Sequence, residues 1–129
     1  MPKQVLIIDD DEDTRIIYSL ILQQAGYVVS QAGDGEAGLY AALDSKPALV
    51  VLDIGLPKMS GWEVCNRLRS DARTSAAKIV VVTAHAHMEE SRKAEECRPD
   101  RLLTKPVSPF DVREHVQQLI GPGVASVDC

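Results

Sequence analysis

The sequence of 129 residues lacks the features that would assign it to several specialised classes of protein. It has no basic surplus: 19 acidic residues against 14 Lys and Arg give a formal net charge of −5, so there is no electrostatic footprint for nucleic acid. No apolar run is long enough to span a bilayer, and no signal peptide precedes the first apolar run near Gln4. We therefore expect a cytoplasmic protein with no direct nucleic-acid contact and no membrane insertion.

Cysteine is also scarce, and its spacing is uninformative for metal binding. Cys65, Cys97 and Cys129 form an odd, scattered set without a Cys-x-x-Cys pair, which predicts reduced thiols. Internal repeats, low-complexity segments and interdomain linkers are absent as well. The length corresponds to one domain, which we expect over residues 1–121, with a loose tail at 122–129.

Short apolar runs rich in β-branched residues recur along the chain and alternate with helical patterns. Such runs are typical of strands buried on both faces of a parallel sheet. The strands are predicted near residues 4–8, 27–31, 49–53, 79–83 and 101–104. Helices are predicted near 14–25 and 36–43, from Ser60, over 88–97, and from Ser108. Five such units with right-handed crossovers predict an α/β protein with a doubly wound five-stranded parallel sheet between two layers of helices.

Two of the predicted helices carry more specific expectations. In the first helix, Ile16, Ile17, Leu20 and Ile21 share one helical face and are predicted to be its buried stripe. Ser60 and Glu63 have the spacing of a capping box, in which each side chain bonds the backbone amide of the other residue.

Polar residues interrupt the apolar runs at the predicted strand ends. Asp9 and Asp10 end the first run, and the later strand ends carry Asp53, Thr83 and Lys105. Because ligands bind at the carboxyl ends of the strands in open parallel sheets, we expect these side chains to share one edge. Clustered carboxylates suit Mg²⁺, and an ammonium and a hydroxyl suit phosphoryl oxygens.

This set of residues predicts phosphoryl transfer to a carboxylate. With a metal bound, one oxygen of Asp53 remains free to attack phosphorus and form an acyl phosphate. Each motif alone has an ordinary structural explanation: the acidic run from Asp9 to Asp13 also suits a helix N-terminus, and Thr83 also suits a strand. The occurrence of four such interruptions at four successive strand ends favours the functional explanation.

Four blocks of sequence resemble the signature blocks of response-regulator receiver domains. They are Ile7-Ile8-Asp9-Asp10-Asp11, the stretch from Val51 to Gly61 (VLDIGLPKMSG), Val82-Thr83-Ala84 and Leu103-Thr104-Lys105-Pro106. The resemblance covers residues 3–121. It implies a flavodoxin-like (βα)5 sandwich and phosphotransfer from a histidine kinase or a histidine phosphotransfer protein onto aspartate.

The resemblance also implies a role for each matching residue. Asp53 would be the phosphoacceptor. Mg²⁺, or alternatively Mn²⁺, would bind Asp10 and Asp53 directly, Asp9 mainly through water, and the backbone carbonyl of Gly55. Thr83 and Lys105 would be switch residues, and the peptide bond from Lys105 to Pro106 would be cis.

Two positions depart from the family pattern. The aromatic residue usually found three positions before the lysine is Leu102 here, so the aromatic part of the switch is absent or rebuilt. The short glycine-containing stretch that usually precedes the fifth strand is Cys97-Arg98-Pro99-Asp100 here.

The leading functional hypothesis is a stand-alone receiver that signals through altered protein contacts at the face of the fourth helix, fifth strand and fifth helix. No separate substrate turnover is expected beyond its own phosphorylation and dephosphorylation. A phosphorelay intermediate and a phosphorylation-independent interaction module remain alternatives. An aspartyl-phosphate phosphatase is disfavoured because Gly55 stands where the general acid belongs, and a flavin carrier because acids follow the first strand.

Overall fold

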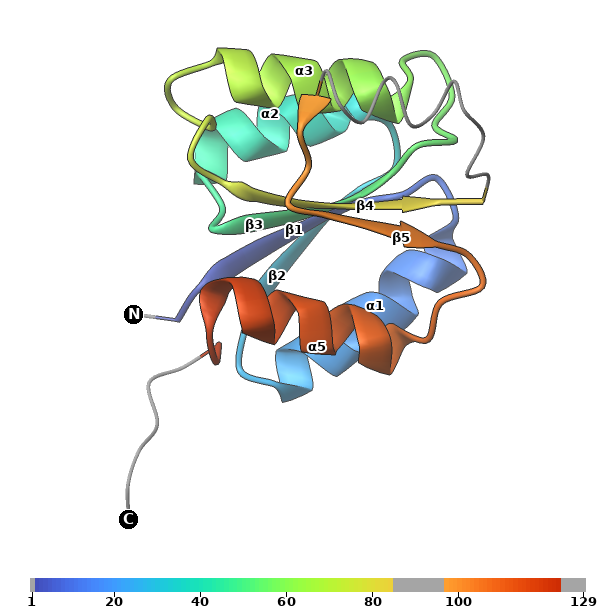
Figure 1. Ribbon diagram of the computed structural model, residues 1–129, viewed down its shortest axis with the longest axis vertical. Helices are drawn as coiled ribbons and strands as arrows, with labels where there is room; N and C mark the ends of the chain where they lie inside the picture. The colour runs from blue at the N-terminus through green and yellow to red at the C-terminus, as the bar shows by residue number, and fades with distance from the viewer. Residues whose placement is uncertain (1, 85–96, 124–129) are drawn as a thin grey trace.

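The computed structural model describes residues 2–84 and 97–123 and shows an open sheet between two layers of helices (Figure 1). The strands are β1 (Gln4–Ile8), β2 (Val28–Ala32), β3 (Leu49–Asp53), β4 (Lys78–Thr83) and β5 (Arg101–Thr104). The described helices are α1 (Glu12–Gln24), α2 (Gly35–Ser45), α3 (Gly61–Ser70) and α5 (Pro109–Ile120). The helix predicted over 88–97 lies outside the described residues except for Cys97. Within the described ranges, no helix has the length and apolarity needed to cross a membrane.

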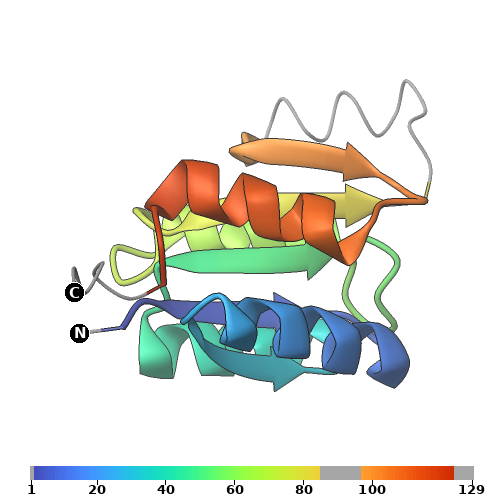
Figure 2. The same cartoon turned by 90° about the horizontal axis from the view of Figure 1, so that it is seen from below.

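All strand pairs are parallel, and the strand order is β2-β1-β3-β4-β5. The arrows accordingly point the same way in Figure 2. Helices α2 and α3 cover one face, and α1 and α5 lie side by side on the other. The doubly wound five-stranded parallel sheet predicted from the strand and helix patterns is therefore confirmed, and it has the flavodoxin-like arrangement that the resemblance implied.

The three central strands are buried on both faces, as their apolar runs predicted. Alternate residues of each strand enter opposite layers of the core. Leu6 and Ile8 of β1 pack in the layer that contains α2 and α3, whereas Val5 and Ile7 pack in the layer that contains α1 and α5. The edge strands β2 and β5 are only partly covered. Strands β1 and β3 lie inside the sheet, so their carboxyl ends are flanked by other strands on both sides.

Helix α1 buries a different face from the predicted one. Its buried residues are Tyr18, Ser19 and Leu22, whereas Ile16, Ile17 and Leu20 are 43%, 47% and 54% exposed. At the start of the helix, the Arg15 guanidinium donates a hydrogen bond to the Asp9 carbonyl at 2.7 Å. Tyr18 and Leu22, four residues apart, then face the sheet. The predicted stripe was wrong for Ile16, Ile17 and Leu20, whereas Ile21 is half-buried, and α1 presents an apolar face outward.

The helix starts predicted at Ser60 and Ser108 are confirmed, with one difference in the capping of α3. The Ser60 hydroxyl accepts a hydrogen bond from the Glu63 amide at 3.3 Å, and the Ser108 hydroxyl accepts one from the Phe110 amide at 3.1 Å. The Glu63 carboxylate accepts a hydrogen bond from Arg67 at 3.2 Å, one turn further along the exposed face. Half of the predicted capping box is therefore observed.

A disulfide joins Cys65 of α3 to Cys97, with the two Cα atoms 5.9 Å apart. The prediction of reduced thiols was therefore wrong for this pair. Spacing rules could not find it, because the residues are 32 positions apart and meet only through the packing of α3 beside the chain that leads into β5. Cys129 lies outside the described residues.

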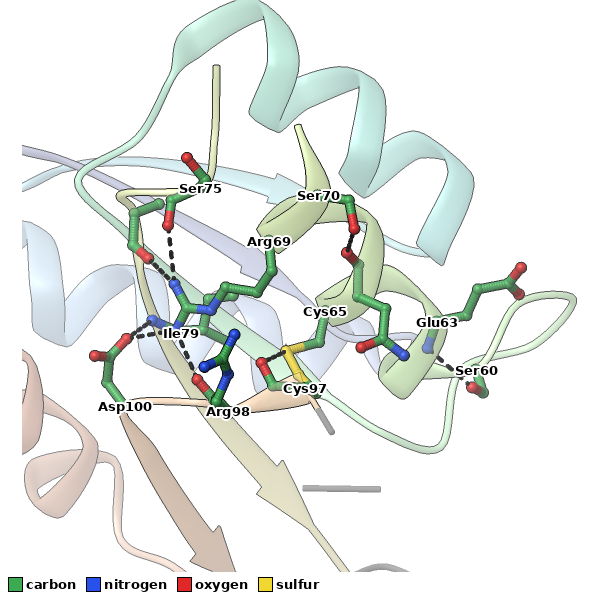
Figure 3. Close-up of a disulfide and its surroundings, with 12 residues drawn as sticks. Ser60, Glu63, Cys65, Arg69, Ser70, Ser75, Ile79, Cys97, Arg98 and Asp100 are labelled. Carbon is green, nitrogen blue, oxygen red and sulfur yellow. Dashed lines mark hydrogen bonds and ion pairs between the residues drawn. A yellow bond between two sulfur atoms is a disulfide. The ribbon is translucent and has the colours of Figure 1, made fainter. Parts of the chain in front are cut away.

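Arg69 ties the end of α3 to the starts of β4 and β5 (Figure 3). Its guanidinium donates hydrogen bonds to the carbonyls of Ala77 and Arg98 and, at 2.8 Å, to the Asp100 carboxylate. The same carboxylate accepts a hydrogen bond from the Ile79 amide. Burial alone raises the pKa of Asp100, but the Ile79 amide and Arg69 together hold that pKa below its usual 3.8.

The chain beyond the expected domain boundary at residue 121 packs against the sheet layer at its amino end. The Lys3 amide donates a hydrogen bond to the Gly123 carbonyl at 3.0 Å. A Cβ atom on Gly123 would lie 2.3 Å from the carbonyl carbon of Gly26, so only glycine fits there. The Lys3 ammonium and the Tyr27 hydroxyl also bond the carbonyls of Ile120 and Gly121.

Substitution Asp100→Asn is expected to lower the free energy of unfolding at neutral pH by about 2 kcal/mol, the range for hydrogen bonds to a charged group. Because the folded pKa lies below the unfolded one, the contribution of the carboxylate is complete above pH 3.8 and is lost as the pH falls through the folded pKa. The deficit should therefore shrink in acid. Urea unfolding from pH 7 to pH 3 measures the deficit, with Asp44→Asn, at an exposed position of α2, as the matched charge control. A deficit independent of pH would contradict the assignment.

Candidate functional site

The candidate site lies where the strand order reverses. Strands β1 and β3 are neighbours, and their connections leave toward opposite sides of the sheet, which is where open α/β sheets bind ligands. The register pairs Ile8 with Leu52, so Asp9 and Asp53, one residue further along each chain, meet at the same edge. This register confirms that the two acidic strand ends converge.

Three carboxylates are close enough to share one cation. Asp9, Asp10 and Asp53 each offer an oxygen, and these oxygens lie within 4.8 Å of one another. Asp9 and Asp53 are buried, with 3% and 8% exposure, whereas Asp10 is exposed. Burial raises the pKa of Asp9 above its usual 3.8; the Asp11 amide lowers it, and the charge of Asp53 raises it again. A divalent cation would relieve this repulsion, so the donor set fits Mg²⁺.

Lys105 supplies the positive charge opposite the acids. Its ammonium lies 3.8 Å from an oxygen of Asp53, and its side chain is about one-third exposed (34%). Its backbone amide donates a hydrogen bond to the Thr83 carbonyl at 2.8 Å, which places the ends of β4 and β5 together. Thr83 itself is buried, with 3% exposure. The peptide bond from Lys105 to Pro106 is cis, as predicted.

The loop after Asp53 is held tightly against the strand end. The Gly55 amide donates a hydrogen bond to the Asp53 carboxylate at 3.2 Å. Gly61, the first residue of α3, lies so close that a Cβ there would be 2.5 Å from the Asp53 carbonyl oxygen. The start of α3 therefore fixes the backbone that carries Asp53. Thr83 and Lys105, the other expected site residues, lie at the same edge of the sheet.

Two residues beside the site were not anticipated from the sequence. Arg15 holds the Asp9 carbonyl, and Tyr18 lies buried in the same layer as Val82 and Val107. Burial, and then the negative charges of Asp9 and Asp53, raises the pKa of the Tyr18 phenol. The residues before Arg15 mark a helix start, but only the tertiary fold directs these two side chains back toward the strand end.

An open groove adjoins the site on the side of α1. It is lined by Lys105 and Pro106, by Ile17 and Tyr18 of α1, and by Val107 and Pro109. Ile17 also belongs to the exposed apolar face of α1. The groove thus connects that face to the ammonium beside Asp53. Leu102, on edge strand β5, is 39% exposed.

A parallel (βα) sheet with an acidic cluster and a lysine at its switch point defines a receiver-type signalling module. In agreement, the family model described as "Response regulator receiver domain" matches residues 5–117. The chain therefore belongs to the response regulator receiver domain family, as the sequence resemblance predicted. Receiver domains bind Mg²⁺ at an acidic pocket and interact with histidine kinases and downstream effectors.

Individual relatives agree with this assignment and differ in length. The "DNA-binding dual master transcriptional regulator RpaA" of Synechocystis sp. is 41% identical over 114 residues, which cover 88% of this chain and 46% of that protein. An "Uncharacterized 14.6 kDa protein in sodA1 3'region" of Leptolyngbya boryana is 32% identical, with 88% and 87% coverage. The chain thus spans about half the length of the first curated relative and most of the second.

A solved structure shows the same architecture. The chemotaxis protein CheY4 of Vibrio cholerae superposes with a TM-score of 0.86 at 26% identity, covering 93% of this chain and all of that one. The correspondence over nearly the whole length supports the strand order and helix layers described above.

We expect Asp9→Asn to stabilise the metal-free protein, because it removes a buried charge whose folded pKa is raised. In the wild type, the same linkage makes metal-free stability rise as the pH falls toward that pKa. With Mg²⁺ at one hundred times its Kd, the wild type should gain about 2.7 kcal/mol and the variant far less.

Urea unfolding with a chelator and with Mg²⁺ measures both effects. Asp44→Asn, an exposed substitution on α2 that removes the same charge, serves as the control and should gain as much from Mg²⁺ as the wild type. An equal Mg²⁺ gain in Asp9→Asn would show that Asp9 has no part in binding the cation.

Proposed function

We propose that Asp53 accepts a phosphoryl group from a phosphohistidine of a histidine kinase or phosphotransfer protein, and that the domain signals by changed protein contacts. One observation carries the proposal: three carboxylates and one ammonium converge on a single strand edge, with Asp53 common to both sets. This combination matches the needs of phosphoryl transfer, which are positioning and charge neutralisation.

Each residue of the site has a role that follows from its position. Asp9, Asp10 and Asp53, with the Gly55 carbonyl, would hold Mg²⁺, which when bound neutralises charge on the phosphoryl oxygens. The Gly55 amide fixes one oxygen of Asp53, and Lys105 approaches the other. Asp53 is therefore oriented by contacts to both of its oxygens before any donor arrives.

The chemical step is a displacement at phosphorus. A carboxylate oxygen of Asp53 forms the new bond to phosphorus while the bond from phosphorus to the histidine nitrogen breaks, and the electron pair leaves with the imidazole. Lys105 would hold one phosphoryl oxygen as a point charge, and Thr83, at the end of the adjacent strand, would donate its hydroxyl to another. The added charge would then bias the contacts of these two residues.

The phosphodonor would dock on the apolar face of α1. Ile16, Ile17 and Leu20 are exposed there, and Ile17 also lines the groove that contains Lys105. A histidine-bearing partner must bring its phosphoryl group to Asp53, so it has to contact the groove beside Lys105. An apolar helical surface on the donor would satisfy this exposed face.

The output surface would include β5 and α5. Leu102 is 39% exposed and Phe110 is 56% exposed, and the Arg113 guanidinium lies 5.2 Å from the Phe110 ring centre. Lys105 lies between these two residues in the chain. A change in its contact with the phosphoryl group would therefore shift the positions of both Leu102 and Phe110. Leu102 has no ring to rotate, so the response would rely on Thr83 and Lys105.

The protein is expected to acquire a single phosphoryl adduct when it is incubated with acetyl phosphate and Mg²⁺. Intact mass measures the adduct. Asp53→Asn should abolish it, and chelation of Mg²⁺ should prevent it, because the acceptor oxygen or the neutralising cation is then missing. Asp44→Asn, the matched exposed substitution, should be labelled normally.

The same experiment separates the alternatives. An adduct that persists in Asp53→Asn would place the acceptor elsewhere. A folded protein that binds Mg²⁺ but gives no adduct with acetyl phosphate or any phosphorylated kinase would contradict the proposal and favour an interaction module that works without phosphorylation.

Ile17→Ser should slow phosphotransfer from a phosphorylated histidine kinase about tenfold, since it removes roughly 1.5 kcal/mol of apolar contact at the docking face. Labelling by acetyl phosphate, which needs no docking surface, should not change. Val28→Ser is the matched control because Val28 is equally exposed (48%) but lies at the start of β2. Single-turnover transfer from a kinase selected by phosphotransfer profiling measures the rates. Equal slowing by both substitutions would argue against docking on α1.

A further inference from the structure

The core of the domain contains a disulfide between Cys65 and Cys97, which has no role in the proposed phosphotransfer. Cys65 lies in the second turn of α3, with its side chain in the apolar cluster formed by β1, β3, β4 and the two helices above them. Cys97 is the residue from which the chain turns toward β5. Figure 3 shows the bond between their sulfur atoms beneath α3.

We propose that Cys65 and Cys97 form a reversible dithiol–disulfide pair, which makes the domain responsive to thiol redox conditions as well as to phosphorylation. The Cα separation of 5.9 Å lies in the range that a disulfide requires. The two residues are 0% and 1% exposed, so the fold itself, rather than a chance surface encounter, brings the thiols together.

The surrounding contacts indicate that the fold does not depend on the bond. Arg69 holds the chain that follows Cys97 through the Arg98 carbonyl, at 3.0 Å, and the Asp100 carboxylate, at 2.8 Å. Asp100 in turn accepts the Ile79 amide. These hydrogen bonds remain when the disulfide is opened, and the two thiols remain apolar groups suited to the core. The reduced protein therefore keeps the same architecture.

The link acts on a strained point of the backbone. Arg98 has φ of 56°, in the left-handed region that residues with side chains rarely occupy. Such a conformation persists only where its surroundings impose it. The disulfide holds the residue before Arg98, and Arg69 holds its carbonyl. Reduction removes one of these two restraints, so the chain leading into β5 is held less firmly to α3.

The redox step balances with a small-molecule disulfide as oxidant. The Cys97 thiol loses its proton and attacks one sulfur of the small disulfide, which releases one small thiol. Cys65 then loses its proton and attacks Cys97 in the mixed disulfide, which releases the second small thiol. The protein loses two hydrogens and the oxidant gains them. Both cysteines are buried, so the exchange requires a local opening of the chain. Cys97 is the first nucleophile because its neighbour Arg98 is exposed, whereas Cys65 lies within a helix.

The test compares oxidised and reduced forms of one sequence. Cys129→Ser is used throughout, so that the third thiol cannot form bonds between molecules. The protein is equilibrated with oxidised glutathione or with dithiothreitol, and free thiols are counted by alkylation in denaturant and intact mass. The oxidised form should have none and the reduced form two. Closing a loop of this length should raise Tm by roughly 10 °C in the oxidised form.

Two further measurements keep the result interpretable. Circular dichroism of the reduced form should show the same secondary structure and a cooperative transition, and a second oxidation should restore the higher Tm. Cys65→Ala and Cys97→Ala should each have a Tm that does not respond to either reagent. This comparison does not depend on phosphorylation of Asp53.

The proposal is overturned if oxidised glutathione leaves both thiols free in the folded protein, or if the Tm of the two redox forms is the same. It is also overturned if reduction unfolds the domain, because the disulfide would then be a structural requirement rather than a reversible one.

Discussion

The functional site depends on the placement of three carboxylates within 4.8 Å of one another at one strand edge. Like charges at this distance repel, and burial of Asp9 and Asp53 makes the repulsion stronger. The arrangement persists because backbone amides bond two of the acids, Arg15 bonds the Asp9 carbonyl, and Lys105 faces Asp53. A site held in this way is suited to gain a cation and a phosphoryl group.

Helix α3 connects the site to a second set of contacts at its other end. Gly61 presses on the backbone of Asp53, while Arg69, two turns later, holds the chain that leads into β5. Cys65 lies between them and is joined to Cys97. The helix therefore spans the distance from Asp53 to the start of β5, the strand that Lys105 follows. Helix α3 thus contacts both the acidic cluster and the Cys65–Cys97 bond.

Helix α1 serves two surfaces with different requirements. Tyr18 and Leu22 complete the core against the sheet, and Ile16, Ile17 and Leu20 remain exposed. Exposure of three neighbouring aliphatic side chains has a solvation cost that core packing does not explain, so their retention is consistent with a partner that covers them. The helix start beside Asp9 places this face next to the acidic cluster.

The sequence alone determined the strands, the parallel sheet and the convergence of Asp9, Asp53, Thr83 and Lys105, because strand ends and their polar residues are local signals and sheet topology brings those ends to one edge. The buried face of α1 was decided by tertiary structure, since both of its faces carry apolar residues and the one with Tyr18 and Leu22 packs into the core. The Cys65–Cys97 bond and the Arg69–Asp100 pair were likewise decided there, because residues about 30 positions apart meet only when α3 packs beside β4 and β5.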